Sequence, residues 1–127
     1  MLLDIKSILE KNKSIAIIRL NGRLDANTAP LLDAEAEKMM TPDINFIVLD
    51  MKHLDYISSA GIRSLLKMAK TMKTRGGKVG ALSRQPQIIK VFEILQALPE
   101  LKIFSNDEEM DQYLDSVQKK VCDGENP

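Results

Sequence analysis

The sequence contains few of the residues that build covalent or metal-based cross-links. It has one cysteine, Cys122, and one histidine, His53. A single cysteine cannot close an internal disulfide, so nothing points to an oxidising compartment. One cysteine and one histidine at distant positions cannot form a zinc site either. We therefore expect no metal site, no cofactor, and a core that is held together by packing alone.

Long apolar runs and an excess of one charge are also missing. No segment approaches the roughly 20 apolar residues that a membrane-spanning helix needs. Residues 1–11 include Asp4 and Glu10, which do not suit a signal peptide. Eighteen basic and eighteen acidic residues cancel, so the formal net charge is zero. This balance argues against nucleic acid or an anionic membrane as the main partner. We expect a cytoplasmic protein without membrane insertion.

The length and composition fit one globular domain. The chain has 127 residues, of which 44% are apolar and 28% are charged. Both fractions are close to the average of globular proteins. We expect a single domain over residues 1–121, followed by a frayed polar C-terminal tail over residues 122–127.

Hydrophobic patterns predict strands that alternate with helices. Short apolar runs predict strands at residues 14–20, 44–49, 78–82 and 101–104. Residues 5–9 fit either a strand or a helical turn, and we favour a strand that pairs with residues 14–20. Apolar residues at helical spacing predict helices over 28–40 and 58–74, another from Pro86, and a last one after Asn106 or Asp107. This order indicates an α/β fold with a mostly parallel sheet of four to five strands and about four helices. The first strand is expected to pair antiparallel with the second.

Three local expectations can be checked against the structure. Asn21-Gly22 is typical of a turn that ends the second strand. Leu31 and Leu32 are both placed on the inward side of the first helix. His53 is interpreted as a loop residue.

Two stretches contain specific sequence motifs in addition to a hydrophobic pattern. The first is residues 21–25, with the sequence NGRLD, after a strand. The second is residues 47–66, IVLDMKHLDYISSAGIRSLL, which is expected to run from a strand through a loop and a serine pair into a helix. Together they resemble the anti-sigma factor antagonists of the STAS family. The resemblance covers residues 7–117 and includes the order of the elements.

The resemblance implies a regulatory binding module with a single phosphorylated serine. The family's phosphorylated serine lies two positions before the glycine of the motif, which here is Ser59 before Gly61. The position of the motif's aspartate is occupied by Ser58. The expected partner-binding residues are Asp25, Ser58, Ser59, Ala60, Gly61 and Arg63. The implied partners are an anti-sigma factor with serine kinase activity and a PP2C-type phosphatase, and the protein itself is expected to be a monomer or a weak dimer.

The residues themselves leave a structural alternative open for both serines. A serine at a helix start can cap the helix by accepting a hydrogen bond from a backbone N–H of the first turn. Ser58 is interpreted mainly as such a cap, and the wider motif favours a functional hydroxyl for Ser59. A phosphate would be tolerated there because the amino end of a helix favours negative charge. Its effect is therefore expected at the surface.

Other functions fit the sequence less well. A hydrolase would need Ser59 and His53 in a triad, but the sequence has no G-x-S-x-G elbow. We therefore expect no catalytic residues and no enzyme activity. Two alternatives remain within binding proteins. One is a STAS subunit of another assembly, either a stressosome-like scaffold or a partner of an ABC transporter. The other is a module that binds a nucleotide or a lipid.

Overall fold

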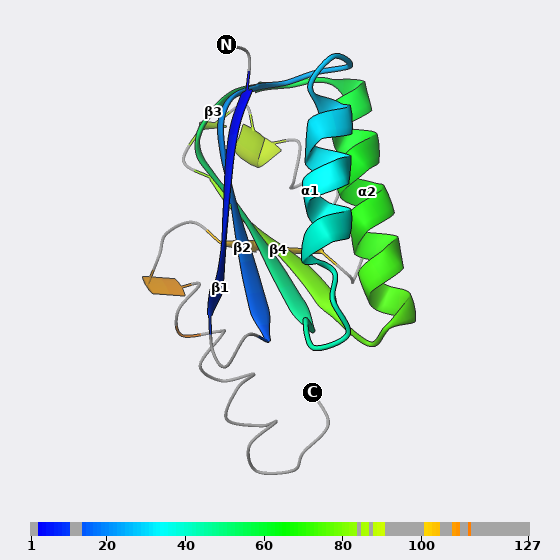
Figure 1. The fold of residues 1–127 in the computed structure, drawn as a ribbon. Coiled ribbons are helices and arrows are strands. Elements are labelled where there is room, and N and C mark those ends of the chain that lie inside the picture. Colours follow the sequence, from blue (N-terminus) through cyan, green and yellow to red (C-terminus); the bar gives the residue numbers. More distant parts are fainter. Residues whose placement is uncertain are drawn as a thin grey trace.

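A five-stranded sheet forms the centre of the computed structural model (Figure 1). The strands are β1 (Leu3–Glu10), β2 (Ile15–Leu24), β3 (Phe46–Ile57), β4 (Lys78–Leu82) and β5 (Leu101–Phe104). Two helices have described bounds, α1 (Ala29–Met39) and α2 (Ser59–Thr74). The structure describes residues 3–10, 14–83, 85, 86, 88–90, 101–104, 108, 109 and 112.

The topology confirms the predicted α/β class. The strands lie in the order β1-β2-β3-β4-β5; β1 is antiparallel to β2, and the other neighbouring strands are parallel. The helices α1 and α2 lie side by side on one face of the sheet (Figure 1). The carboxyl end of β2 leads through the loop of residues 25–28 into α1, and the carboxyl end of β3 leads through Ser58 into α2.

Packing on both faces of the sheet explains the apolar run at the start of β3. All six residues from Phe46 to Met51 are buried. Ile47 and Leu49 belong to the large cluster beneath the helices, while Phe46 and Val48 belong to a smaller cluster on the other face. A strand that is covered on both sides needs apolar residues at successive positions, as its sequence predicted.

The two helices present narrow apolar stripes to the sheet. In α2, Leu65, Met68 and Met72 are buried, while Arg63 and Lys70 are exposed. At the far end of α2, the Arg75 guanidinium donates hydrogen bonds to the backbone carbonyls of Met40 and Thr41. This contact joins the carboxyl ends of the two helices, where a cation also interacts favourably with the helix dipole of α1.

Leu31 does not point inward as expected. Its exposed fraction is 53%, whereas its neighbour Leu32 is fully buried. The buried residues of α1 are Ala29, Leu32 and Ala36, at steps of three and four. Successive residues of a helix are about 100° apart, so a stripe this narrow includes only one of two adjacent leucines.

The expected turn at Asn21-Gly22 and the expected loop at His53 are also wrong. Strand β2 continues through Asn21, which pairs with His53 of β3, to Leu24. The register shifts twice along this pair, once before Asn21 and once after Gly22. Gly22 has a φ of 119°, which residues with a side chain rarely adopt. Glycine here permits an irregular but continuous ladder, so the chain does not turn.

Part of the predicted C-terminal half lies outside the described residues. Residues 86 and 88–90 are helical, as are 108, 109 and 112. The bounds of the two predicted C-terminal helices, and the predicted tail over 122–127, fall on residues that the structure does not describe. None of the described helices is long and apolar enough to cross a membrane.

Candidate functional site

The predicted site residues lie where β2 and β3 end side by side. Leu24 and Ile57 are paired in the parallel ladder. The next residue on β3, Ser58, donates its backbone N–H to the Leu24 carbonyl at 2.9 Å. This bond ties the loop before α1 to the turn before α2. It brings together two sequence motifs, NGRLD and SSAG, that are more than 30 residues apart.

The two adjacent serines have different environments. Ser58 has an extended backbone, and its Oγ accepts a hydrogen bond from the Gly61 N–H at 3.3 Å. Its carbonyl accepts the first backbone bond of the helix, from Ile62 at 2.9 Å. Ser58 is therefore the N-cap of α2, in agreement with its interpretation as a cap. Ser59 is the first helical residue and is exposed. Within the described residues, its hydroxyl has no hydrogen-bond partner.

This difference predicts unequal losses of stability from two neighbouring alanine substitutions. We expect Ser58→Ala to lower the free energy of unfolding by about 1 kcal/mol, because the Gly61 N–H loses its acceptor. Ser59→Ala should change it by less than about 0.5 kcal/mol, since an exposed hydroxyl is removed. Urea denaturation of both variants measures this. Equal destabilisation by the two changes would contradict the assignment of the cap.

Asp25 organises the loop before α1. Its Oδ1 accepts backbone N–H bonds from Asn27 at 2.9 Å and from Thr28 at 3.1 Å. Its own N–H donates to Thr28 Oγ1 at 2.8 Å, and the same hydroxyl donates to the Arg23 carbonyl at 2.8 Å. Thr28 stands at the N-cap of α1, but its side chain bonds back into the loop and makes no cap hydrogen bond to the helix. Asp25 is thus half-buried and held in place beside the Ser58 turn.

Gly61 supports the site from beneath. It is buried, and a Cβ at this position would lie 2.8 Å from Leu24 Cγ and 2.9 Å from Ile57 Cγ1. Its neighbour Ala60 is partly buried and packs against the core. The ends of both strands therefore press against the first turn of α2. Of the residues expected to bind a partner, Gly61 and Ala60 contribute mainly to this packing, while Ser59 and Arg63 are exposed.

Sequence reasoning missed an exposed aromatic residue next to the site. Tyr56 is 41% exposed, and the Arg23 guanidinium carbon lies 4.3 Å from the centre of its ring. The two residues are paired in the ladder, after the second register shift. Tyrosine and arginine are frequent in the residues that dominate binding energy at protein interfaces. The signal was the arginine within the NGRLD motif, but only strand pairing shows which residue it contacts.

The chemistry that this arrangement permits is the acceptance of a phosphate at Ser59. A first-turn position of α2 places added negative charge beside backbone N–H groups at the positive end of the helix dipole. Arg63 follows Ser59 by one turn on the same side of the helix. Within the described residues, no cluster of three or more His, Cys, Asp or Glu side chains could hold a metal ion.

Comparison with known proteins identifies the family of this chain. Residues 6–110 match the family described as the STAS domain. The chain is 34% identical, over 70% of its length and 77% of the relative, to BtrV of Bordetella bronchiseptica, which is named as a candidate anti-sigma factor antagonist.

Two solved structures share the fold. One is the unphosphorylated form of the anti-sigma factor antagonist SpoIIAA, with a TM-score of 0.71 and 18% identity over 91% of this chain and 98% of that chain. The other is the phosphorylated form of SpoIIAA, described as a Bacillus cell fate determinant, with a TM-score of 0.68 and 19% identity over 87% of this chain and 99% of that chain. On the family match, the sequence identity and the shared fold together, this chain belongs to the STAS domain family.

Proposed function

We propose that this protein is an anti-sigma factor antagonist that is switched off by phosphorylation of Ser59. The observation that carries the proposal is the exposed Ser59 hydroxyl on the first residue of α2, next to a different serine that already caps the helix. The hydroxyl is thus available to a kinase without loss of the cap. The similarity to proteins named anti-sigma factor antagonists supports the class of partner.

Phosphorylation changes the surface and leaves the fold intact. A phosphate adds about −1.5 to −2 charges at neutral pH. Because Ser59 is exposed at a helix amino end, this charge is compatible with the local structure. A partner docked over the same turn would instead meet a bulky dianion. Repulsion and desolvation at such a contact cost several kcal/mol, and about 1.4 kcal/mol is tenfold in affinity.

The binding surface extends over both strand ends. In this proposal the surface includes Asp25, Ser58 and Arg63 besides Ser59, and the Arg23–Tyr56 pair extends it along β2 and β3. In this proposal the anti-sigma factor is also the serine kinase, a PP2C-type phosphatase restores binding, and the protein has no catalytic activity of its own. The whole cycle takes place in the cytoplasm, where sigma factors act.

Phosphosite mapping tests the proposal. The protein is used to recover its anti-sigma factor from the native host, and the purified pair is incubated with Mg²⁺ and ATP. We expect phosphate on Ser59, in wild type and in Ser58→Ala, and none in Ser59→Ala. Phosphate on Ser58, or equal phosphorylation of the Ser59→Ala variant, would contradict the assignment. Intact-protein mass spectrometry before and after incubation gives the stoichiometry.

A further inference from the structure

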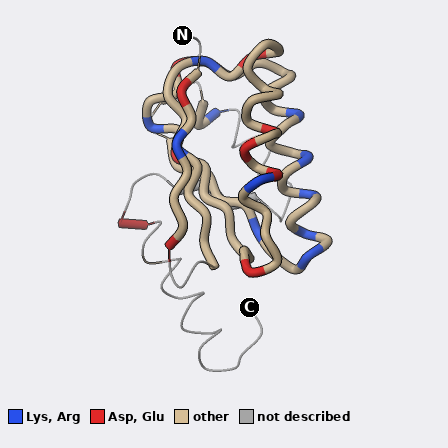
Figure 2. The backbone as a smooth tube through the Cα atoms, in the orientation of Figure 1, with Lys and Arg blue, Asp and Glu red and all other residues tan. Residues whose placement is uncertain are grey.

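The balanced net charge conceals a separation of charge between the two helices. Helix α2 contains four basic residues and no acidic ones: Arg63, Lys67, Lys70 and Lys73, hereafter the basic stripe. Its neighbour α1 contains Asp33, Glu35 and Glu37 with a single basic residue, Lys38. Figure 2 shows basic residues along the outer length of α2 and acidic residues on α1. The strongly basic surface of the protein is therefore only as wide as the helix α2.

The basic stripe faces away from the core. All four of its side chains are exposed, and they lie opposite the buried stripe of Leu65, Met68 and Met72. Successive members are three or four residues apart, so like charges are direct neighbours on the helix surface and repel one another. Within the described residues, no ion pair is recorded for Arg63, Lys67 or Lys70. An acidic partner surface would relieve this repulsion.

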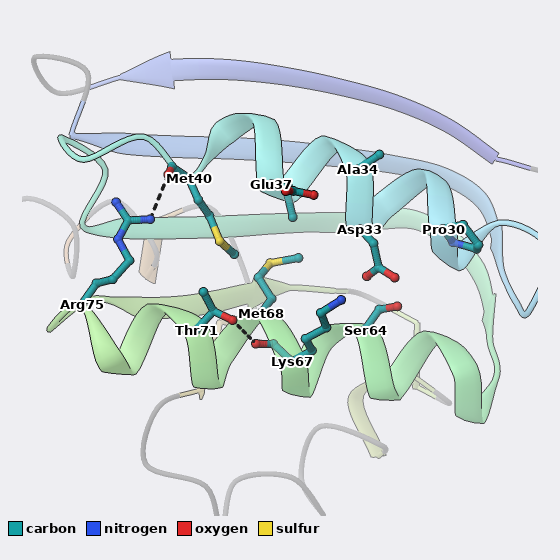
Figure 3. A pocket seen from close by; sticks show the side chains of 11 residues that line it. Pro30, Asp33, Ala34, Glu37, Met40, Ser64, Lys67, Met68, Thr71 and Arg75 are labelled. Atoms are coloured by element: carbon teal, nitrogen blue, oxygen red, sulfur yellow. Dashed lines mark hydrogen bonds between the residues drawn. The ribbon is translucent and has the colours of Figure 1, made fainter.

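The acidic residues of α1 limit the shape of the partner. A groove of about 650 Å³ runs between α1 and α2. Asp33 of α1 and Lys67 of α2 point toward each other across it (Figure 3). A broad anionic surface such as DNA or a lipid bilayer would cover both helices and would meet the carboxylates of α1. A narrow acidic element would contact α2 alone.

We propose that the basic stripe of α2 docks an acidic, elongated surface of the protein partner, such as the carboxylate-bearing face of a helix. This inference rests on the proposed function and adds the chemistry of the partner surface. From Arg63 to Lys73 the stripe is about 15 Å long, at about 1.5 Å per helical residue. Three to four carboxylates along one helical face span a similar length.

The position of Ser59 gives this stripe a part in the switch. Ser59 and Arg63 are one turn apart on the same side of α2, so a phosphate on Ser59 would lie at the amino end of the stripe. The phosphate would neutralise Arg63 and would present its own negative charge to the partner's carboxylates. A single modification would thus both weaken the attraction and add repulsion.

Charge reversal on matched positions tests the inference. Lys67→Glu/Lys70→Glu reverses two charges of the stripe, and Lys6→Glu/Lys38→Glu reverses two exposed charges outside α2. Affinity for the purified anti-sigma factor is measured by calorimetry at low and at high salt. We expect the stripe variant to lose at least about tenfold in affinity at low salt and to show a weaker salt dependence. The control variant should stay within about twofold.

Further outcomes separate this inference from the proposed function. Wild-type affinity in the stripe variant, or an equal loss in the control variant, would overturn the docking role of α2. If Ser59→Asp still abolished binding in that case, the proposed function would stand. If Ser59→Asp also bound at full strength, both would fail. Wild-type binding to double-stranded DNA or to anionic vesicles, lost in the stripe variant, would replace the protein partner with a different polyanion. Far-ultraviolet circular dichroism confirms that each variant is folded.

Discussion

Ser59→Asp is expected to weaken binding to the anti-sigma factor by at least about 100-fold, which corresponds to about 2.7 kcal/mol. The residue is exposed at the amino end of α2, so the added carboxylate meets the docked partner. The free protein should not be destabilised, because an acidic residue in the first turn of a helix is favourable by about 0.3–1 kcal/mol. Calorimetric titration and thermal denaturation of the same preparation measure both effects.

An uncharged variant of the same size separates charge from bulk. Ser59→Asn matches Ser59→Asp in shape but adds no charge, and we expect it to lose less than about tenfold in affinity. Equal losses in the two variants would show that steric exclusion, and not charge, operates the switch. A loss of affinity in Ser59→Asp that accompanied a lower melting temperature would indicate damage to the helix start.

The second large effect is expected in the packing beneath the site. Gly61→Ala should lower the free energy of unfolding by about 1–3 kcal/mol, since its methyl group would overlap Leu24 Cγ and Ile57 Cγ1. The higher helix propensity of alanine offsets at most about 1 kcal/mol of this cost. Leu24→Ala alone should cost about 2–5 kcal/mol because it leaves a cavity at a fully buried position.

The combination of the two substitutions is the sharper measurement. In Gly61→Ala/Leu24→Ala the new methyl group occupies space that the leucine has left. The loss in free energy of unfolding in the double variant should therefore be smaller than the sum of the two single losses by at least about 1 kcal/mol. Gly76→Ala is the matched control. Gly76 has a positive φ of 74° and nothing within 4 Å of an added Cβ, so its cost is backbone strain alone. Its effect should add to that of Leu24→Ala, and additivity in the Gly61 pair would contradict the direct contact.

Local patterns were sufficient to predict the order of the elements from β1 to β5 whose bounds the structure describes. The strands at 78–82 and 101–104 have the predicted bounds, and α1 and α2 agree with their predictions to within one residue at each end. These segments combine a clear apolar period with strong stop signals, namely Pro42 after α1 and Gly76-Gly77 after α2. Where the period and the stop signal agree, neighbouring residues alone determine the element.

The sequence-based predictions were wrong where strand pairing overrides local preference. The pair Asn21-Gly22 favours a turn, but β3 supplies partners to β2 as far as Leu24, and the ladder absorbs the irregularity in two register shifts. The same pairing extends β3 through His53 to Ile57 and brings Arg23 over the ring of Tyr56. No local pattern contains these contacts, because their two halves are about 30 residues apart in the chain.

For the site, the sequence by itself determined that a serine pair starts an amphipathic helix, because hydrophobic spacing and the SSAG motif are local. The family motif favoured Ser59 as the functional serine, but only the tertiary structure shows the physical reason why its hydroxyl, and not that of Ser58, is available. The bond from the Ser58 N–H to the Leu24 carbonyl holds Ser58 in an extended conformation, from which its hydroxyl reaches the Gly61 N–H. Because Ser58 is the cap, the Ser59 hydroxyl stays exposed to solvent. This difference between the two serines depends on Leu24 of the neighbouring strand β2, which is distant in the sequence.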